Sequence, residues 1–256
     1  MKFYCVSHKP PAFEIEIDYT HFCSKDLGLN NQVIIPDDFY GESFHGDILS
    51  EYTQLFGLAD FLSRNENPQE KIYIFQYRKF ITTKPANQVS TNMPYAHAYL
   101  PLEAKKYFPT TSDLNELSEH LVGPIVKYKS VANQYAAVHL IQDYCKFICS
   151  LSLSGDFSIV RCANFADSEL LIPSPSLGLT QVGIFISHMN ILKSIWSHFY
   201  KYFYIQRNGY QRRVGGFLLE RLHSFLILEE IKKENIKFSK GQQIVISNSL
   251  VITRSE

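Results

Sequence analysis

Residues 71–80 read KIYIFQYRKF, an apolar run followed at once by polar and basic side chains. The alternating and β-branched character of Lys71–Phe75 predicts a strand, with Gln76-Tyr77-Arg78-Lys79 at its carboxyl end. A second strand is predicted over 2–7, and the polar turn Ser7-His8-Lys9-Pro10 follows it. Nucleotide-binding α/β sheets usually place ligand contacts directly after such strands. These two polar ends are therefore the first candidate site.

Strands and helices alternate along the rest of the chain. Further strands are predicted over 32–35 and 182–186, and helices over 49–64, 110–121, 131–151, 189–204 and 212–233. Residues 82–99 are predicted to form a long loop that could be a lid over the site, and 152–181 a loop-rich stretch. Residues 243–253 could form a strand pair or a packed extension. The alternation predicts an α/β sandwich with a mostly parallel or mixed sheet.

Composition limits the function classes. The chain has 256 residues, enough for a large core, and Lys+Arg and Asp+Glu balance at 25 each. No global charge therefore attracts nucleic acid or an anionic membrane, and a surface for single-stranded RNA is not expected. The five cysteines lack the paired short spacing of a zinc site or a disulfide scaffold, which favours a reducing, cytosolic setting. Without an apolar signal core or a run of ~20 apolar residues, we expect a soluble or peripheral protein.

Five phrases in fixed order carry a resemblance to a known family. They are VSHKPPAF (6–13), GDILSEYTQLFGL (46–58), IYIFQYRKF (72–80), YKSVANQYAAVHLIQDY (128–144) and YQRRVGGFLLERL (210–222). Together they resemble a bacterial family of capsular or exopolysaccharide-synthesis glycosyltransferases. That family's own phrases read roughly THKPY, DNIS followed by CELTGLYW, a strand ending in HYRRY, and YQ-R-GFLSERL, and it has a basic-aromatic helix with a His and an Asp. The resemblance covers nearly the whole chain.

The resemblance implies a fold and an activity. It implies one domain similar to the A-type, nucleotide-sugar-binding, Rossmann-like fold, with a mixed central sheet and a helical C-terminal part. Residues 1–109 would bind the nucleotide sugar and 110–256 would form the acceptor side. The chain would be a hexosyltransferase moving a sugar, such as galactose in pyranose or furanose form, from a nucleoside diphosphate, with UDP favoured. The acceptor would be a capsular, lipopolysaccharide or exopolysaccharide glycan, free or lipid-linked, at the inner face of the cell membrane. A non-catalytic glycan- or nucleotide-binding partner is the alternative.

The departing diphosphate needs positive charge. Most A-type enzymes supply it with a divalent metal held by an Asp-any-Asp motif, which this chain lacks, because Asp37 and Asp38 are adjacent. We therefore predict that Arg78, with Lys79, neutralises the diphosphate and that no metal is required, although manganese or magnesium stays open. The alternative is that Arg78 forms a salt bridge beside the sheet. Ser7, His8, Lys9, Gln76, Tyr77, Arg213 and Arg221 complete the expected donor site.

Three residues are candidates for catalysis. Asp47 matches the start of the DNIS phrase but could equally be a helix N-cap. His139 and Asp143 lie four residues apart on a predicted helix, a spacing suited to a base and its orienting carboxylate, although a mid-helix histidine is more often part of the core. Glu220 could be the base or bind a sugar hydroxyl, and its alternative is an ion pair with Arg213 or Arg221.

Residues 196–213 form an aromatic and basic stretch. The stretch could rest on a membrane surface, but the preferred interpretation is that half of its rings fill the core and the rest stack on sugars.

The chain departs from the family phrases at three positions. The resemblance places Gln76 where the family has His, Gln54 where it has Glu, and Gly183 where it has Asn. These departures bear on the donor, the acceptor and the activity itself.

Overall fold

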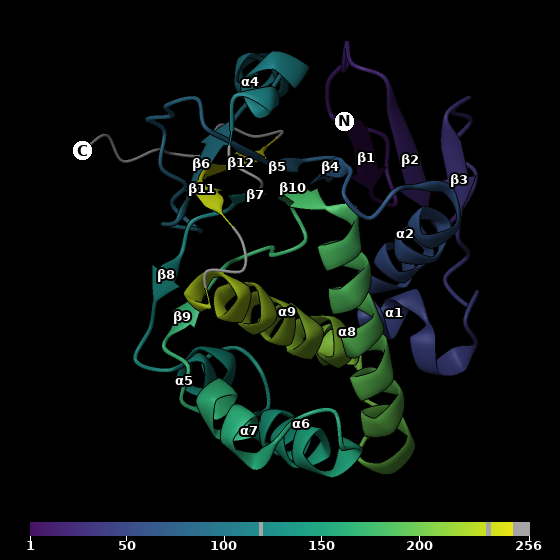
Figure 1. Ribbon diagram of the computed structural model, residues 1–256, viewed down its shortest axis with the longest axis vertical. Coiled ribbons are helices and arrows are strands. Elements are labelled where there is room, and N and C mark those ends of the chain that lie inside the picture. Colours follow the sequence, from purple (N-terminus) through teal and green to yellow (C-terminus); the bar gives the residue numbers. More distant parts are fainter. Residues whose placement is uncertain (118–119, 234–236, 248–256) are drawn as a thin grey trace.

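The centre of the molecule is a mixed sheet in the order β11-β7-β10-β4-β1-β2-β3 (Figure 1). This is a computed structural model, and it describes residues 1–117, 120–233 and 237–247. The strands are β1 (Lys2–Val6), β2 (Tyr19–Cys23), β3 (Gln32–Ile34), β4 (Lys71–Phe75), β7 (His120–Val122), β10 (Gly178–Gln181) and β11 (Phe238–Lys240). All pairings among them are parallel except those of β10, which runs antiparallel to β4 and β7. The predicted α/β fold with a mixed central sheet is confirmed.

The two central strands are apolar because both of their faces are covered. Ile72–Phe75 is at most 1% exposed, and Phe3–Val6 at most 3%. Strands buried on both faces are usually near-continuous apolar runs rather than alternating ones. The predicted strands at 2–7, 32–35 and 71–75 are therefore found close to their expected limits.

The strand order creates a switch point between β1 and β4. From β1 the chain proceeds to β2 and β3 on one side, and it then returns to place β4 on the other side. Connections therefore leave these two carboxyl ends in opposite directions, which opens a crevice there. In open α/β sheets ligands bind in this crevice.

Three long helices pack against the sheet and each other: α2 (Tyr52–Asn65), α8 (Val182–Tyr202) and α9 (Val214–Lys232). Figure 1 shows α9 crossing the middle of the molecule. Every residue from Val214 to Ile227 is buried except Glu220. A helix that is buried on all sides belongs inside a protein, so a carboxylate left partly exposed within this buried stretch is a candidate for function. None of the described helices is long and apolar enough to cross a membrane.

The other helices are no longer than α2. They are α1 (Gly46–Leu49), α3 (Pro101–Ala104), α4 (Thr111–Asn115), α5 (Val131–Ala136), α6 (Ile141–Ser154), α7 (Ile159–Ala166) and the 3-10 turns η1 (Glu42–Phe44), η2 (Lys105–Tyr107) and η3 (Gly209–Arg213). Helices α5, α6 and α7 lie at the end of the molecule away from the central sheet, and α4 lies at the opposite end, beside the strands (Figure 1). Strands β7, β10 and β11 all follow residue 109, so the central sheet uses both predicted halves of the chain. The division at residue 109 stays a prediction.

The segment predicted as a loop over 82–99 is anchored at both ends by strands. Strand β12 (Gln242–Ile246) pairs antiparallel with β5 (Lys79–Thr82) and parallel with β6 (Ala96–Tyr99). A third sheet pairs β8 (Val126–Lys127) with β9 (Leu170–Leu171). The predicted tail element over 243–253 is thus strand up to Ile246, and residues 248–253 lie outside the described part of the chain.

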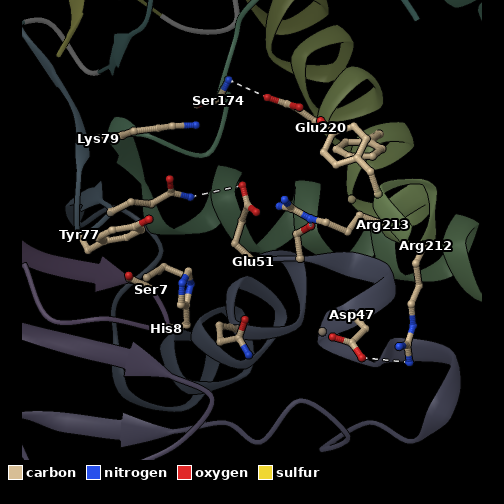
Figure 2. A pocket seen from close by; sticks show the side chains of 18 of the residues that line it. Ser7, His8, Asp47, Glu51, Tyr77, Lys79, Ser174, Arg212, Arg213 and Glu220 are labelled. Carbon is tan, nitrogen blue, oxygen red and sulfur yellow. Dashed lines mark hydrogen bonds and ion pairs between the residues drawn. The ribbon is translucent and has the colours of Figure 1, made fainter. Parts of the chain in front are cut away.

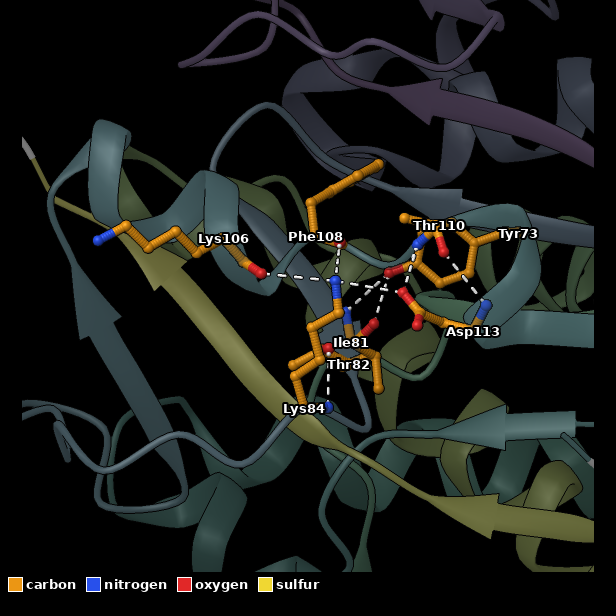
Figure 3. A network of polar contacts seen from close by, with 8 residues as sticks. All are labelled: Tyr73, Ile81, Thr82, Lys84, Lys106, Phe108, Thr110 and Asp113. Atoms are coloured by element: carbon orange, nitrogen blue, oxygen red, sulfur yellow. Dashed lines mark hydrogen bonds and ion pairs between the residues drawn. The ribbon is translucent and has the colours of Figure 1, made fainter. Parts of the chain in front are cut away.

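A polar network fixes the start of that segment (Figure 3). The ammonium group of Lys84 forms an ion pair with Asp113 at 3.2 Å and donates to the carbonyl oxygen of Phe108 at 2.9 Å. Asp113 also completes a capping box with Thr110 at the start of α4. Because one partly buried cluster holds both segments, the chain after β5 is packed against the domain along its first residues.

Several predicted elements are wrong, and each error has a physical cause. The helix expected over 49–64 begins at Tyr52, because Ser50 has a φ of 57° that breaks it from α1. The helix expected over 131–151 is broken between α5 and α6. The late strand expected over 182–186 is the start of α8, and the strand is β10 just before it. Propensity is a weak guide to such boundaries because tertiary pairing decides them.

The remaining corrections concern short elements that pair with distant segments. The helix expected over 110–121 ends at Asn115, and His120–Val122 is a strand of the central sheet. The loop-rich stretch over 152–181 contains α7 and the strands β9 and β10. Strands of two to four residues are too short to show a period in the sequence.

Gly178 permits the antiparallel strand β10, and its replacement tests the sheet. The residue has a φ of +112°, and an added Cβ would collide with the carbonyl oxygen of Leu121 on β7. We expect Gly178→Ala to lower the free energy of unfolding by about 3 kcal/mol, because backbone strain and overpacking add. Gly28→Ala is the control: its φ is +70° with no atom within 4 Å, so it should cost only about 1 kcal/mol. Equal losses in urea denaturation would contradict this packing.

Candidate functional site

A cavity of about 720 Å³ opens at the carboxyl ends of β1 and β4 (Figure 2). Its volume lies within the ~300–1,000 Å³ typical of ligand pockets. The predicted site residues that line it are Ser7, His8, Asp47, Gln76, Tyr77, Arg78, Lys79, His139, Arg213, Glu220 and Arg221. Lys9 is not among the lining residues; its ammonium group lies 5.9 Å from the centre of the Tyr77 ring. The fold thus brings together eleven predicted residues from distant parts of the sequence.

The junction between α1 and α2 forms one wall, and the N-terminus of α9 lies directly on it. A Cβ built on Gly216 would lie 2.8 Å from the Ser50 hydroxyl and 2.9 Å from the carbonyl oxygen of Leu49. Only glycine allows this approach without displacing backbone. As a result the Arg213 guanidinium, one turn before Gly216, reaches Ser50 and donates to its hydroxyl at 2.7 Å.

Three cations in the cavity have no carboxylate partner in the part of the chain that the structure describes. Within residues 1–117, 120–233 and 237–247, no ion pair is formed by Arg78, Lys79 or Arg213. The alternative interpretation of Arg78 as a salt bridge beside the sheet is therefore not supported. A cluster of unpaired cations around a cavity attracts anions, and guanidinium groups bind phosphate oxygens in a bidentate manner.

The pKa of His8 responds to the positive charges around it. Its pKa is lowered from the ordinary value, first by partial burial and then by the charges of Lys9, Arg78, Arg213 and Lys25. Four cations therefore act on one ring at the end of β1. His8 is neutral at neutral pH and can donate or accept a hydrogen bond without adding charge.

Two carboxylates, Glu51 and Glu220, face the same cavity (Figure 2). The amide nitrogen of Gln76 donates to Oε1 of Glu51 at 3.3 Å, and the backbone N–H of Ser174 donates to Oε1 of Glu220 at 3.0 Å. Neither carboxylate forms an ion pair with a described residue, so the expected alternative for Glu220, a pair with Arg213 or Arg221, is not found. Each keeps an oxygen that can accept a further hydrogen bond.

The two aspartates of the cavity are already partnered. Asp47 forms an ion pair with Arg212 at 2.9 Å, and Asp37 accepts from Gln54 at 3.2 Å. Asp47 is not the N-cap of α1: that position is His45, whose ring nitrogen accepts from the backbone N–H of Asp47 at 3.1 Å. Asp47 thus shapes the wall through Arg212, and its catalytic role stays a prediction.

The residues at this site do not fit a divalent metal. Within the described ranges no group of three or more His, Cys, Asp or Glu side chains could hold one. The strand end where a metal-binding motif would stand carries Gln76 and Arg78, and a guanidinium there would repel a cation. No step is therefore assigned to a metal.

The predicted pairing of His139 with Asp143 is wrong. Asp143 is buried and forms a two-point ion pair with Arg207, at 2.8 and 3.3 Å. The break between α5 and α6 separates it from His139, whose ring instead stacks on Phe217 with centres 3.9 Å apart. The pKa of His139 is lowered to about 4 by burial and then by Arg221. A base with so low a pKa would be weak at neutral pH.

Arg221 is part of the framework beside the cavity. It is 4% exposed and donates to the Gln134 side chain at 2.6 and 3.1 Å and to the carbonyl oxygen of Phe217 at 2.6 Å. Its donors are largely occupied, so it positions Gln134 in the wall. Direct donor binding by Arg221 stays a prediction.

Sequence reasoning missed Glu51, which lies near the centre of the cavity (Figure 2). In an unbroken helix over 49–64 it would be one polar residue among many, and only the break at Ser50 turns it inward. No local signal marks it, because the break at Ser50 leaves the apolar period of 49–64 unchanged.

The other departures also find a place. Gln76 binds Glu51, as described above, and Gln54 binds Asp37. Gly183 lies in the first turn of α8, where its N–H donates to the carbonyl oxygen of Pro68 at 2.9 Å. It is not among the residues that line the cavity, so this departure does not alter the site.

Comparisons with known proteins agree with the fold. No protein-family model matches the sequence, and no curated protein matches it. Among solved structures the chain is similar to the apo structure of WbbM, a bifunctional glycosyltransferase, with a TM-score of 0.73 and 19% identity. The match covers 96% of this chain and 45% of that chain, so the chain spans less than half of that protein. At this identity the likeness shows the fold, and the predicted similarity to a glycosyltransferase fold is confirmed.

His139 should make the protein sensitive to acid. Its folded-state pKa, about 4, lies below the ordinary value of 6.5, so its stabilising effect is complete above pH 6.5 and is lost as pH falls toward 4. By pH 5 this loss should reach about 2 kcal/mol. We expect His139→Phe to flatten the dependence of unfolding free energy on pH between 7.5 and 5 relative to wild type, with near-UV circular dichroism checking the fold. An unchanged slope would contradict the assignment.

Proposed function

We propose that this protein is a glycosyltransferase that moves a sugar from a nucleoside diphosphate to a glycan. One observation carries the proposal: three cations without carboxylate partners among the described residues converge at the switch point of a glycosyltransferase-like fold. A diphosphate is the anion that such a crevice suits, because ligands of α/β sheets bind there and guanidinium groups match phosphate geometry.

The donor would lie along the strand ends. Arg78, Lys79 and Arg213 bind the diphosphate, and Ser7, His8, Gln76 and Tyr77 contact the nucleoside and ribose. Tyr77 offers a ring to a base, and the Arg78 guanidinium lies 5.2 Å from its centre. Lys9, outside the cavity lining, adds positive charge beside Tyr77.

Transfer then requires charge stabilisation and proton removal. The bond between the anomeric carbon and the diphosphate oxygen breaks, and the cations stabilise the departing charge. An acceptor hydroxyl forms the new bond, and its proton passes to a carboxylate if the anomeric centre inverts. Glu220 is our choice of base, because it lies on α9 two helical turns beyond Arg213, about 10 Å along the helix axis, and does not follow the strand ends that carry Arg78 and Lys79. Glu51, held by Gln76 beside the cations, would accept a hydrogen bond from the donor sugar.

The finer assignment follows the sequence resemblance. We propose a UDP-linked hexose, such as galactose in pyranose or furanose form, and a capsular, lipopolysaccharide or exopolysaccharide acceptor, free or lipid-linked. All five cysteines are free, which suits the cytosol, where nucleotide sugars are used. The structural neighbour is itself a bifunctional glycosyltransferase, which supports the class of reaction. A non-catalytic nucleotide- or glycan-binding partner is the second candidate, favoured by Gln76 in place of the family's histidine.

Nucleotide binding is the first test. We expect UDP to raise the melting temperature, since a ligand at ~100 times its dissociation constant stabilises by about 2.7 kcal/mol. Arg78→Ala and Arg213→Ala should each weaken UDP binding about tenfold or more, because a hydrogen bond to a charged group is lost. Arg64→Ala, an exposed arginine on α2, is the matched control and should leave the affinity unchanged. Parallel scans with GDP, CMP and TDP, with and without manganese, identify the base and any metal requirement. Manganese-dependent binding would retain the transferase but contradict our cationic mechanism.

Turnover separates the enzyme from the binder. Release of UDP from UDP-hexoses should occur in wild type and fall by about 10²–10⁴ in kcat in Glu220→Gln, with UDP affinity unchanged. Glu51→Gln should mainly raise KM for the UDP-hexose. The reverse pattern would make Glu51 the base, and UDP binding without any turnover would establish the non-catalytic partner instead.

A further inference from the structure

The aromatic and basic stretch over 196–213 divides into two groups in the structure. Trp196 and Phe199 are at most 1% exposed and fill the core. Tyr202 and Tyr210 are each 60% exposed. Of these two tyrosines, Tyr210 lines the cavity and Tyr202 does not. The Tyr210 ring is thus exposed to water at the cavity and does not contribute to the buried core.

Tyr210 rests on a rigid base of two buried rings. The His139 ring lies nearly parallel to it, with centres 5.7 Å apart and planes at 18°, and Phe217 lies 5.0 Å away at 41°. His139 and Phe217 are themselves stacked and are 8% and 9% exposed. The position of Tyr210 is therefore set by packing, although most of its surface is free.

The turn that carries Tyr210 is tied to two segments of the cavity lining. Gln211 donates to the carbonyl oxygen of Val138 at 3.0 Å, while Arg212 forms its ion pair with Asp47 and Arg213 binds Ser50 at the α1–α2 junction. Three consecutive side chains after Tyr210 thus fix η3. A surface turn held in this way keeps its ring in place before any ligand arrives, which lowers the entropic cost of binding.

The surroundings of Tyr210 combine apolar and polar surface. Val138, 54% exposed, lines the cavity beside the ring cluster, and Gln134, Ser174 and Glu220 line it further along. A sugar ring has the same division, with C–H groups on its faces and hydroxyl groups on its edge. An aromatic face attracts C–H groups, while amide and carboxylate groups bind the hydroxyls.

We infer that Tyr210, with Val138, is a stacking platform for the terminal sugar ring of the acceptor glycan. The inference rests on the proposed function, since it assigns the acceptor side of the same site. Tyr210 lies in η3, just before α9 and its Glu220, whereas Tyr77, Arg78 and Lys79 follow β4. Arg213, also in η3, turns to Ser50 instead. A nucleobase has its own ring partner in Tyr77, so the second ring, on a different element, serves the second substrate.

Saturation-transfer NMR with two separate probes tests the platform. Wild-type protein is titrated with methyl glycosides of galactose, glucose and mannose, and independently with UDP. Tyr210→Ala should weaken binding of the preferred glycoside about fivefold, as expected for the loss of one ring contact, and leave UDP affinity unchanged. Tyr210→Phe keeps the ring and should retain glycoside binding. Tyr202→Ala, which removes an equally exposed tyrosine outside the cavity, is the matched control.

The outcomes separate this inference from the proposed function. UDP binding with no glycoside affected by Tyr210→Ala, or with no glycoside bound by wild type near its solubility limit, overturns the platform and leaves the donor site standing. A variant that loses UDP and keeps the glycoside assigns the ring to the nucleotide and also overturns it. Absence of UDP binding in wild type instead contradicts the proposed function.

Discussion

The site depends on the close approach of α9 to the junction between α1 and α2. Gly215 and Gly216 have no side chains, so the first turn of α9 lies on Leu49 and Ser50, and the Trp196 ring packs beside it. The same junction is where the positive φ of Ser50 ends one helix and turns Glu51 inward. These two backbone features, one on each segment, therefore fix the positions of both Arg213 and Glu51 at the cavity. A larger residue at either glycine would push α9 away from the α1–α2 junction.

The arginines near the site fall into two groups, those bound to acceptors of the protein and those left free to bind a ligand. Arg212, Arg207 and Arg221 each have strong acceptors in Asp47, Asp143 and Gln134. These three arginines are therefore occupied by protein acceptors, and they hold the framework of the site in place. Arg78 and Arg213 are left in exposed positions, where an unpaired charge costs little because water solvates it. The chain is neutral as a whole, yet it presents a positive wall to the cavity.

The sequence predicted what depends on local pattern and missed what depends on distant pairing. The polar ends after β1 and β4 follow apolar runs, so Ser7, His8, Gln76 and Arg78 could be placed at one edge of a sheet. Glu51 could not, because the break at Ser50 follows from packing against α9 and leaves no mark in the apolar period. The pairing of Asp143 was wrong for the same reason: Arg207 reaches it from a segment 64 residues away. Strands β7, β10 and β11 owe their existence to neighbours across the sheet.

The place of β12 has a consequence for the order of folding. This strand, near the end of the described chain, lies between β5 and β6, and the N–H of Ile246 donates to the carbonyl oxygen of Arg78 at 2.8 Å. The segment that carries Arg78 therefore lacks its strand partner until residue 246 has left the ribosome. Non-local pairing of this kind slows folding, and an emerging chain is exposed to aggregation in the meantime. The part of the cavity wall that carries Arg78 is therefore complete only after residue 246 has been synthesised.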